Sequence, residues 1–439
     1  MHMDIGKLHG MVAEDAAVRR RQVLQPVGGK GDKIFPPTYP GEGQNAPPRH
    51  VYERRRLNGA DIWCVLVDSV QSQANRLEEC LLAAISDGIP IPYVEVDFTE
   101  ANLDGVTKIT SLDAPHRVYD AILRDSLYNG APFMESDVGK RLAKAKSADA
   151  SALLETSPTA LLFGAWHSTG QGGGLGAKFS RCLISEIVAV EVPVDTTSNN
   201  TGRLQFHEND VELTWRSGRE KISGIDVTTS GRRTGGRVDP LGVLKGLERV
   251  KIFKSPSGWN ITKEGAGKNA KEAKPSEINH GNIRPSVQRL GITCDHLEHS
   301  FVLSFAALRR LRFGSPEKDA AGRGLLAALG LVAIAEQDAQ GYALRSRCDL
   351  ACDGRAPLEL VHPDGKPESV DIDRVTARAL YSSTFEAAKK AGFKLSDEPL
   401  RLTPQEKLVA IVKESQRLAL EGKGGDQDEA GGDDSGSGN

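Results

Sequence analysis

A glycine-rich stretch near the middle of the sequence has the composition of a phosphate-binding loop. Residues 170–176 contain five glycines, and Lys178 and Arg181 follow closely behind them. Glycine has no Cβ, so its backbone amide can approach a ligand closely and can adopt a positive φ. Backbone amides beside fixed cations favour an anion, most often a phosphate. Two sources of phosphate suit this loop, a nucleotide cofactor and the backbone of a nucleic acid.

Nucleotide-binding motifs match this loop incompletely. The Walker motif requires lysine after glycine and then a hydroxyl residue, whereas Lys178 follows Ala177 and precedes Phe179. The dinucleotide fingerprint G-x-G-x-x-A is satisfied by Gly172, Gly174 and Ala177. Only about eight residues separate the loop from the next apolar run, however, fewer than the dozen or so of a crossover between parallel strands. A nucleotide-dependent enzyme that uses this loop is therefore an alternative hypothesis.

A nucleic-acid backbone is the other candidate ligand. Lys178 and Arg181 would neutralise phosphates, and Trp166 or His167 would stack on a base or a sugar. Considered alone, Trp166 better suits a core position at the end of a strand. A second polar group, at the start of a helix predicted over residues 70–85, suits phosphates, base edges or plain solvent exposure: Gln71, Gln73, Asn75 and Arg76.

Other chemically capable residues do not form a convincing site. Ser168 is adjacent to His167, but neighbouring residues rarely face each other and no nucleophile elbow surrounds them. Two groups of cysteines and histidines are loosely spaced or splay to both faces of a strand: Cys294, His296 and His299, and Cys348, Cys352 and His362. The sequence predicts no catalytic residue, no metal site and no cofactor.

Length and composition fit a globular protein. The 439 residues suffice for one elaborate domain or two ordinary ones. The longest apolar runs are shorter than a membrane span, and the N-terminus lacks the apolar core of a signal peptide. Six cysteines in a chain of this length do not make a disulfide framework. We therefore expect a cytoplasmic protein without a membrane partner.

The charge is unevenly distributed along the chain. The formal net charge is −3, but residues 424–439 contain five acids and no base, so the remainder is slightly positive. Four groups of arginines stand out and are a modest indication of polyanion binding, although each could also be a solvated face: Arg19, Arg20 and Arg21; Arg54, Arg55 and Arg56; Arg232, Arg233 and Arg237; and Arg309, Arg310 and Arg312.

Hydrophobic periodicity predicts an α+β protein. Strands and helices alternate too irregularly for a doubly wound sheet. Predicted strands cover residues 62–67, 92–98, 160–166, 185–194, 291–302 and 342–350. Predicted helices cover residues 1–25, 70–85, 116–128, 135–146, 303–313, 320–337, 371–391 and 403–421.

The same patterns divide the chain into five parts. Residues 195–285 are rich in Gly, Ser, Thr, Asn, Lys and Arg, and they are too weakly apolar for a core of their own. We interpret them as a basic, flexible insertion. The other parts are a helix and Pro/Gly-rich arm (1–48), the first part of the body (49–194), its second part with C-terminal helices (286–421), and a disordered acidic tail (422–439).

Several segments together resemble one known family. They are SVQSQANRLEE, LLFGAWHSTGQGGGLGAKFSR, SGRRTGGRVDPLG, EINHGNIRPS and VLSFAALRRLRFG. Their combination is similar to the RAMP-superfamily backbone subunit of type I-G (formerly I-U) CRISPR interference complexes, also called Cascade. The resemblance runs from about residue 45 to 395. Arg284 departs from the pattern, where a proline is expected.

The resemblance implies a fold and a role. The fold would be a modified RRM or ferredoxin-like palm with helical finger elements and a protruding hairpin, the thumb, supplied by the insertion. Copies of such a subunit stack along the spacer of one CRISPR RNA and display it for pairing with invading DNA, without cutting nucleic acid. The implied partners are CRISPR RNA, target DNA, further copies of the chain and other subunits of the complex.

The resemblance also gives the polar residues a role in RNA binding. The helix start would line the guide path, and the insertion would contact RNA or a neighbouring copy. The predicted RNA-binding residues are Gln71, Gln73, Asn75, Arg76, Trp166, His167, Ser168, Gly172, Gly173, Gly174, Lys178, Arg181, Arg232, Arg233, Arg237, His280 and Asn282. A further alternative is an RNA-cleaving RAMP subunit that uses Asp195 or Asp226, although no sequence feature distinguishes either aspartate.

Overall fold

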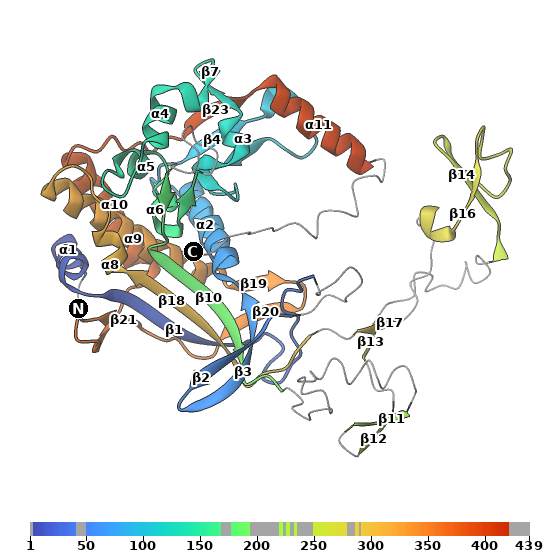
Figure 1. Cartoon of the computed structure of the whole chain (residues 1–439), viewed down its shortest axis with the longest axis horizontal. Helices are drawn as coiled ribbons and strands as arrows, with labels where there is room; N and C mark the ends of the chain where they lie inside the picture. Colours follow the sequence, from blue (N-terminus) through green and yellow to red (C-terminus); the bar gives the residue numbers. More distant parts are fainter. Residues whose placement is uncertain are drawn as a thin grey trace, which may run out of the picture. The chain divides into compact units, whose positions relative to one another are not determined.

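The computed structural model describes residues 3–40, 50–167, 177–193, 219–222, 225–228, 232–234, 249–278, 286–288 and 291–420 (Figure 1). The chain forms two compact units. The first comprises Met1–Val192 and Ile292–Asn439, and the second comprises Pro193–Gly291. Each unit is considered by itself.

A large antiparallel sheet is the centre of the first unit (Figure 1). Its central strands, β10 and β18, pair without interruption from Leu183↔Leu303 to Val190↔His296. The spatial order is β19 (Tyr342–Arg345), β20 (Cys348–Cys352), β1 (Ala17–Pro26), β18 (His296–Ser304), β10 (Leu183–Val190), β3 (Ala60–Asp68) and β2 (Tyr52–Leu57). The edge of β1 that pairs with β20 near its C-terminal end pairs near its N-terminal end with β21 (Leu358–Val361). Strand β21 also pairs with β22 (Pro367–Val370).

Helices cover one face of this sheet (Figure 1). The longest, α9 (Pro316–Gln340), starts where the Ser315 side chain accepts a hydrogen bond from the Lys318 amide, and it ends at Gly341 with φ +84°. Residues 324–337 of α9 are all buried, and Phe301 and Leu303 of β18 face the same core. The other covering helices are α1 (Ile5–Glu14), α2 (Val70–Ser86), α8 (Phe305–Arg309) and α10 (Arg374–Lys390).

The connections give the fold its class. Strand β18 leads through α9 to β20, and β1 lies between these two strands, as in the split β-α-β unit of ferredoxin-like folds. Strands β3 and β10, which the chain joins through α2, are instead direct antiparallel neighbours. The predicted α+β class with an RRM-like palm is confirmed. Within the described residues, no helix combines the length and apolarity that a bilayer crossing requires.

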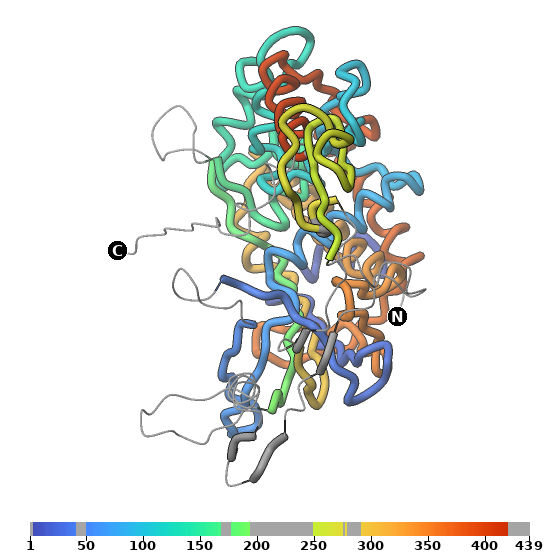
Figure 2. The backbone as a smooth tube through the Cα atoms, turned by 90° about the vertical axis from the view of Figure 1, so that its right-hand side faces the viewer, coloured from blue at the N-terminus to red at the C-terminus, as the bar shows by residue number. Residues whose placement is uncertain are grey.

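A second, smaller sheet extends the first unit. Its strands lie in the order β5 (Lys108–Thr110), β4 (Val94–Asp97), β23 (Leu400–Pro404), β6 (Ser126–Tyr128) and β7 (Ala131–Pro132). The sheet joins early and C-terminal parts of the chain, because β23 pairs with β4, and in Figure 2 the light-blue and teal segments lie beside the red ones. The helical elements near it are η1 (Thr99–Ala101), η2 (Arg117–Tyr119), α3 (Ala121–Arg124), η3 (Phe133–Glu135), α4 (Asp137–Ala143), α5 (Ser151–Thr156), α6 (Thr159–Phe163) and α11 (Glu406–Leu420).

Several predicted elements have a different structure. The helix predicted over residues 116–128 is instead η2, the four-residue helix α3 and the strand β6. The helix predicted over residues 1–25 ends at Glu14, and residues 17–26 form β1. Arg20 and Gln22 alternate with exposed residues and are buried in polar contacts, so the strand period is invisible in an apolar pattern. The strand predicted over residues 160–166 is mostly helix α6, because this short apolar run is buried from all sides. Periodicity cannot distinguish the two for such runs.

The second unit contains three separate pieces of described structure. Strand β11 (Arg219–Ile222) pairs with β12 (Ile225–Thr228), and β13 (Arg232–Thr234) pairs with β17 (Ser286–Gln288). The third piece is a three-stranded antiparallel sheet in the order β15 (Gly258–Asn260), β14 (Ile252–Ser255) and β16 (Lys271–Ala273), followed by η5 (Pro275–Ile278).

Two helical glycines test how tightly the first unit packs. A Cβ on Gly139 of α4 would lie 2.1 Å from the Phe133 carbonyl oxygen, whereas a Cβ on Gly10 of α1 would meet nothing within 4 Å. Gly139→Ala should therefore destabilise the protein by about 1–3 kcal/mol. Gly10→Ala should stabilise it by up to about 1 kcal/mol, because alanine is the better helix former. Urea unfolding measures both changes, and equal effects of the two substitutions would contradict the packing.

Candidate nucleic-acid interface

The glycine-rich loop is closed at its base by a short antiparallel pair. Residues 168–176 lie outside the described part, but β8 (Ala165–Trp166) pairs with β9 (Lys178–Phe179). The His167 amide also donates to the Ala177 carbonyl, at 2.8 Å. A strand follows the loop here, whereas the dinucleotide fingerprint requires a helix at this position. The loop therefore lacks the flanking geometry that a dinucleotide site needs.

An aromatic ring and a cation meet on the surface of this stem. Trp166 and Lys178 are cross-strand partners, and the Trp166 side chain is 56% exposed. The Lys178 Nζ atom lies 5.7 Å from the centroid of the Trp166 ring. This distance suits a cation–π interaction. An exposed indole beside a lysine can stack on a base while the lysine pairs with the adjacent phosphate.

The His167 side chain points into the protein interior beneath the stem. It is 6% exposed, and its ring stacks on Tyr119 with centroids 5.0 Å apart. Burial, together with the nearby Arg124 charge, lowers the pKa of His167. The ring is therefore neutral at physiological pH, and its Nδ1 atom has no hydrogen-bond partner within the described residues.

Arg181 is a half-buried cation without a carboxylate partner in the described part of the chain. Burial and the neighbouring Arg117 charge lower its pKa, and its Nε–H has no acceptor there. Arg117 itself binds both carboxylate oxygens of Glu78, at 2.8 and 2.7 Å, and donates to the Gly164 carbonyl at 3.1 Å. Within the part that the structure describes, no carboxylate therefore neutralises the positive charge of Arg181.

The strand arginines, in contrast, are neutralised by acids. Arg19 pairs with Glu359 at 2.8 Å and Arg21 with Glu298 at 2.6 Å, both between neighbouring strands. The other ion pairs of the strand arginines at residues 19–21 and 54–56 are Arg20–Asp338, Arg54–Asp61, Arg55–Glu53, Arg55–Glu186 and Arg56–Asp61. The first two arginine clusters of the sequence are therefore matched with carboxylates rather than left available for a polyanion.

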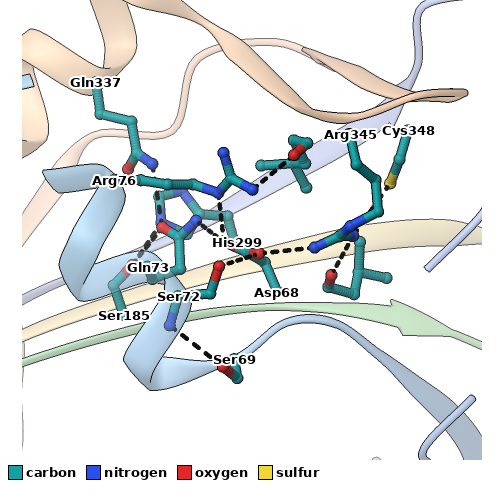
Figure 3. Close-up of polar contacts among 12 residues, drawn as sticks. Asp68, Ser69, Ser72, Gln73, Arg76, Ser185, His299, Gln337, Arg345 and Cys348 are labelled. Atoms are coloured by element: carbon teal, nitrogen blue, oxygen red, sulfur yellow. Dashed lines mark hydrogen bonds and ion pairs between the residues drawn. The ribbon is translucent and has the colours of Figure 1, made fainter. Parts of the chain in front are cut away.

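The start of α2 belongs to an interior hydrogen-bond network (Figure 3). Asp68, at the end of β3, is fully buried. Its carboxylate accepts hydrogen bonds from Ser72 Oγ at 2.8 Å, Gln73 Nε2 at 2.6 Å, Arg76 Nε at 2.9 Å and Arg345 Nη2 at 3.1 Å. Gln73 and Arg76 thus bind other residues inside the protein. They are two of the four residues at the start of α2 that the sequence analysis predicts to contact RNA.

A buried serine and histidine continue the same network. The Asp338 carboxylate can only accept, so the Tyr342 hydroxyl donates to it, at 3.1 Å. His299 Nδ1 lies 3.2 Å from the Tyr342 oxygen, and His299 Nε2 lies 2.7 Å from Ser185 Oγ, which donates to Gln73 Oε1 at 3.1 Å. Burial, reinforced by the Arg20 charge, lowers the pKa of His299 to about 3, so the ring is neutral at physiological pH.

This serine–histidine pair has no access to a substrate. Ser185 is 2% exposed and His299 is 0% exposed. The pair therefore joins β10 and β18 to the layer of helices. Neither residue was singled out by the sequence for this role, although the apolar alternation of β18 places His299 on its buried face.

The other predicted site residues are distributed as follows. Gln71 and Asn75 are exposed on α2. Arg232 and Arg233 lie on β13, with side chains outside the described part. Ser168, Gly172, Gly173, Gly174, Arg237, His280 and Asn282 lie outside the described residues altogether. Sequence reasoning missed Tyr119, Arg117 and Glu78, which no motif connects to the loop. No group of three His, Cys, Asp or Glu side chains in the described part could hold a metal.

One comparison with known proteins gives a match. Residues 18–194, from β1 to just beyond β10, match the model of the family described as CRISPR-associated protein GSU0053. The matched segment contains β3, α2 and the stem of the glycine loop. The match indicates a CRISPR-associated protein. No curated protein matches the chain.

His299 should make stability depend on pH. Its folded-state pKa is depressed from the ordinary 6.5 to about 3, so only the unfolded state takes up a proton between these values. Stability should therefore fall as the pH is lowered from about 6.5 towards 3. In His299→Gln the fall, measured as the urea midpoint against pH, should be shallower than in the wild type. His116→Gln, which changes an exposed histidine, is the control and should keep the wild-type slope.

Proposed function

We propose that this protein is a non-catalytic backbone subunit of a type I CRISPR interference complex, which binds the guide RNA and displays its spacer for pairing with invading DNA. The observation that carries the proposal is the stem of the glycine loop. An exposed Trp166 is paired there with Lys178, and Arg181 has no carboxylate partner in the described residues. This stem lies inside the segment that matches a CRISPR-associated family.

The chemistry of the stem suits a single-stranded RNA backbone. Cations supply the sequence-independent part of the affinity, and an aromatic face accepts any base. Such a grip holds the guide while its base edges stay available for pairing, which is the division of labour in RNA-guided recognition. The exposed Gln71 and Asn75 of α2 remain predicted RNA contacts. Gln73 and Arg76 would act by holding α2 in place.

Multiple copies on one guide are the second part of the proposal. The resemblance to RAMP backbone subunits implies that copies of the chain lie side by side along the spacer, together with other subunits of the complex. We therefore expect the chain to form RNA-dependent oligomers. Purification with and without a guide RNA, followed by measurement of particle mass and bound nucleic acid, tests this directly. A monomer that ignores RNA at low salt would refute the proposal.

Removing the two stem cations should weaken RNA binding. The double variant Lys178→Ala/Arg181→Ala should lose about tenfold in affinity at 0.15 M salt and lower the salt slope by about 1.4, the value for two phosphate contacts with a single strand. The matched control is Arg19→Ala/Arg21→Ala, which removes the same charge from arginines paired with Glu359 and Glu298. This control should stay within about twofold of the wild type. Equal losses in the two variants would indicate a general charge effect and remove the stem from the RNA path.

Trp166 should contribute by stacking. Trp166→Ala should cost about 1–3 kcal/mol of RNA-binding free energy, because one base loses its aromatic partner. Trp166→Phe should retain most of the affinity, since a smaller aromatic face remains. Fluorescence anisotropy with a labelled guide measures both variants. If phenylalanine and alanine weaken binding equally, the indole does not act as a stacking platform.

A further inference from the structure

A cavity lies beside the smaller sheet of the first unit. Its volume is about 380 Å³, within the range of about 300–1,000 Å³ that is usual for small-molecule sites. Its walls come from three parts of the chain: the ends of β4 and β6, the helices α4 and α5, and the connection between α10 and β23. Of the residues predicted to bind RNA, none in the described part of the chain lines it. The cavity is therefore a site of its own.

Hydrogen bonds hold the walls of this cavity in place. The Leu400 amide donates to the Tyr93 carbonyl oxygen at 2.9 Å, next to the parallel pairing of β23 with β4. One oxygen of the Glu155 carboxylate accepts a hydrogen bond from the Arg141 side chain, and the other accepts one from the Lys394 amide at 3.0 Å. The carboxylate thus joins α4, α5 and the connection to β23, so the cavity exists before any ligand arrives.

Two tyrosines give the cavity an aromatic lining. Tyr93 and Tyr128 are both partly buried, and Val138 and Leu400 add apolar surface beside them. Neither phenol hydroxyl has a hydrogen-bond partner within the described residues. Burial raises the pKa of Tyr93, so its hydroxyl keeps its proton and can donate a hydrogen bond. Such walls suit a flat ring with polar substituents.

The charged residues of the lining leave one cation unpaired. Arg141 is paired with Glu155, and Glu398 lies 3.6 Å from Arg401, which is outside the lining. Lys394 is exposed and has no carboxylate partner within the described residues. The rim of the cavity therefore has one positive charge in excess, which favours an anionic ligand.

We propose that this cavity binds a small anionic ligand with a planar ring, of the size of a nucleoside monophosphate, with the ring against Tyr93 and Tyr128 and the anionic group at Lys394. A lysine ammonium serves a phosphate or a carboxylate equally as a point charge. Both anions therefore belong among the probes. Because the cavity and the stem of the glycine loop share no residue, the inference does not depend on the guide-RNA function.

Titration calorimetry of the full chain tests the ligand class with four probes: AMP, adenosine, inorganic phosphate and benzoate. AMP should bind at least about tenfold more tightly than adenosine or phosphate, because only AMP offers both the ring and the charge. Tighter binding of benzoate than of AMP would identify an aromatic carboxylate as the ligand. Equal affinities for AMP and phosphate, or no binding of AMP and benzoate at about 1 mM, would overturn the inference.

Cavity variants locate the bound probe. Lys394→Gln should weaken AMP about tenfold and leave adenosine unchanged, because a hydrogen bond to a charged group is lost. Lys413→Gln, which changes an exposed lysine of α11, is the matched control and should bind AMP as the wild type does. Tyr128→Leu should weaken AMP and adenosine alike, whereas Tyr128→Phe should retain most of the affinity.

A larger side chain should close the cavity. Val138→Trp should abolish binding of AMP and should also remove the rise in the thermal unfolding temperature that AMP gives in the wild type. Should this variant fail to fold, Lys394→Gln still decides the matter, because it alters an exposed side chain. Wild-type affinity for AMP in both Lys394→Gln and Tyr128→Leu would overturn the inference.

The loop stem is the competing site for a nucleotide. Lys178→Ala/Arg181→Ala should bind AMP as the wild type does, and Lys394→Gln should bind guide RNA as the wild type does. A loss of AMP binding in the stem variant alone would place the nucleotide at the stem and overturn the inference. A loss of AMP binding in the cavity variants alone would support it, whatever the outcome for guide RNA.

Discussion

The positions of the other parts of the palm depend on the hydrogen bonds made to the buried carboxylate of Asp68. It receives hydrogen bonds from Ser72, Gln73 and Arg76 of α2 and from Arg345 of β19. A buried charge is tolerated because these donors replace its lost hydration. The same helix carries Glu78, which holds Arg117, and Arg117 binds the backbone at Gly164, where the loop stem begins. One helix therefore connects the sheet to the candidate RNA-binding stem.

The sequence predicts where helices lie better than it predicts which polar residues are buried and which are exposed. Ser69 and Ser315 cap helices that the apolar pattern already indicates. Strand β1 was missed because Arg20 is buried against Asp338, a partner more than three hundred positions away, which no local pattern reveals. For the same reason, Gln73 has the sequence signature of a surface contact and lies in the core. Trp166 and Lys178 were singled out because they flank a loop whose composition is itself unusual, and the structure pairs them across its stem.

Charge pairing separates the basic residues of this protein into two classes. The arginines of the central sheet are held between strands by carboxylates, so they contribute to the cohesion of the sheet and add little net field. The cations at the loop stem, Lys178 and Arg181, lack such partners within the described residues and lie close to the exposed Trp166. By number of arginines alone, the central sheet would be the better candidate for a polyanion-binding surface. By unpaired charge, the loop stem is the better candidate.

The second unit is inserted between two strands that are neighbours in the sheet. Val190 of β10 is opposite His296 of β18, so residues 191–295 form in effect the loop of a single hairpin. The entropy of closing a loop grows only with the logarithm of its length, and doubling the length costs about 0.6 kcal/mol. The register of β10 and β18 is fixed by their own pairing and core. The sheet therefore places almost no thermodynamic limit on the size of the insertion, which can be lengthened, shortened or exchanged while the palm keeps its structure.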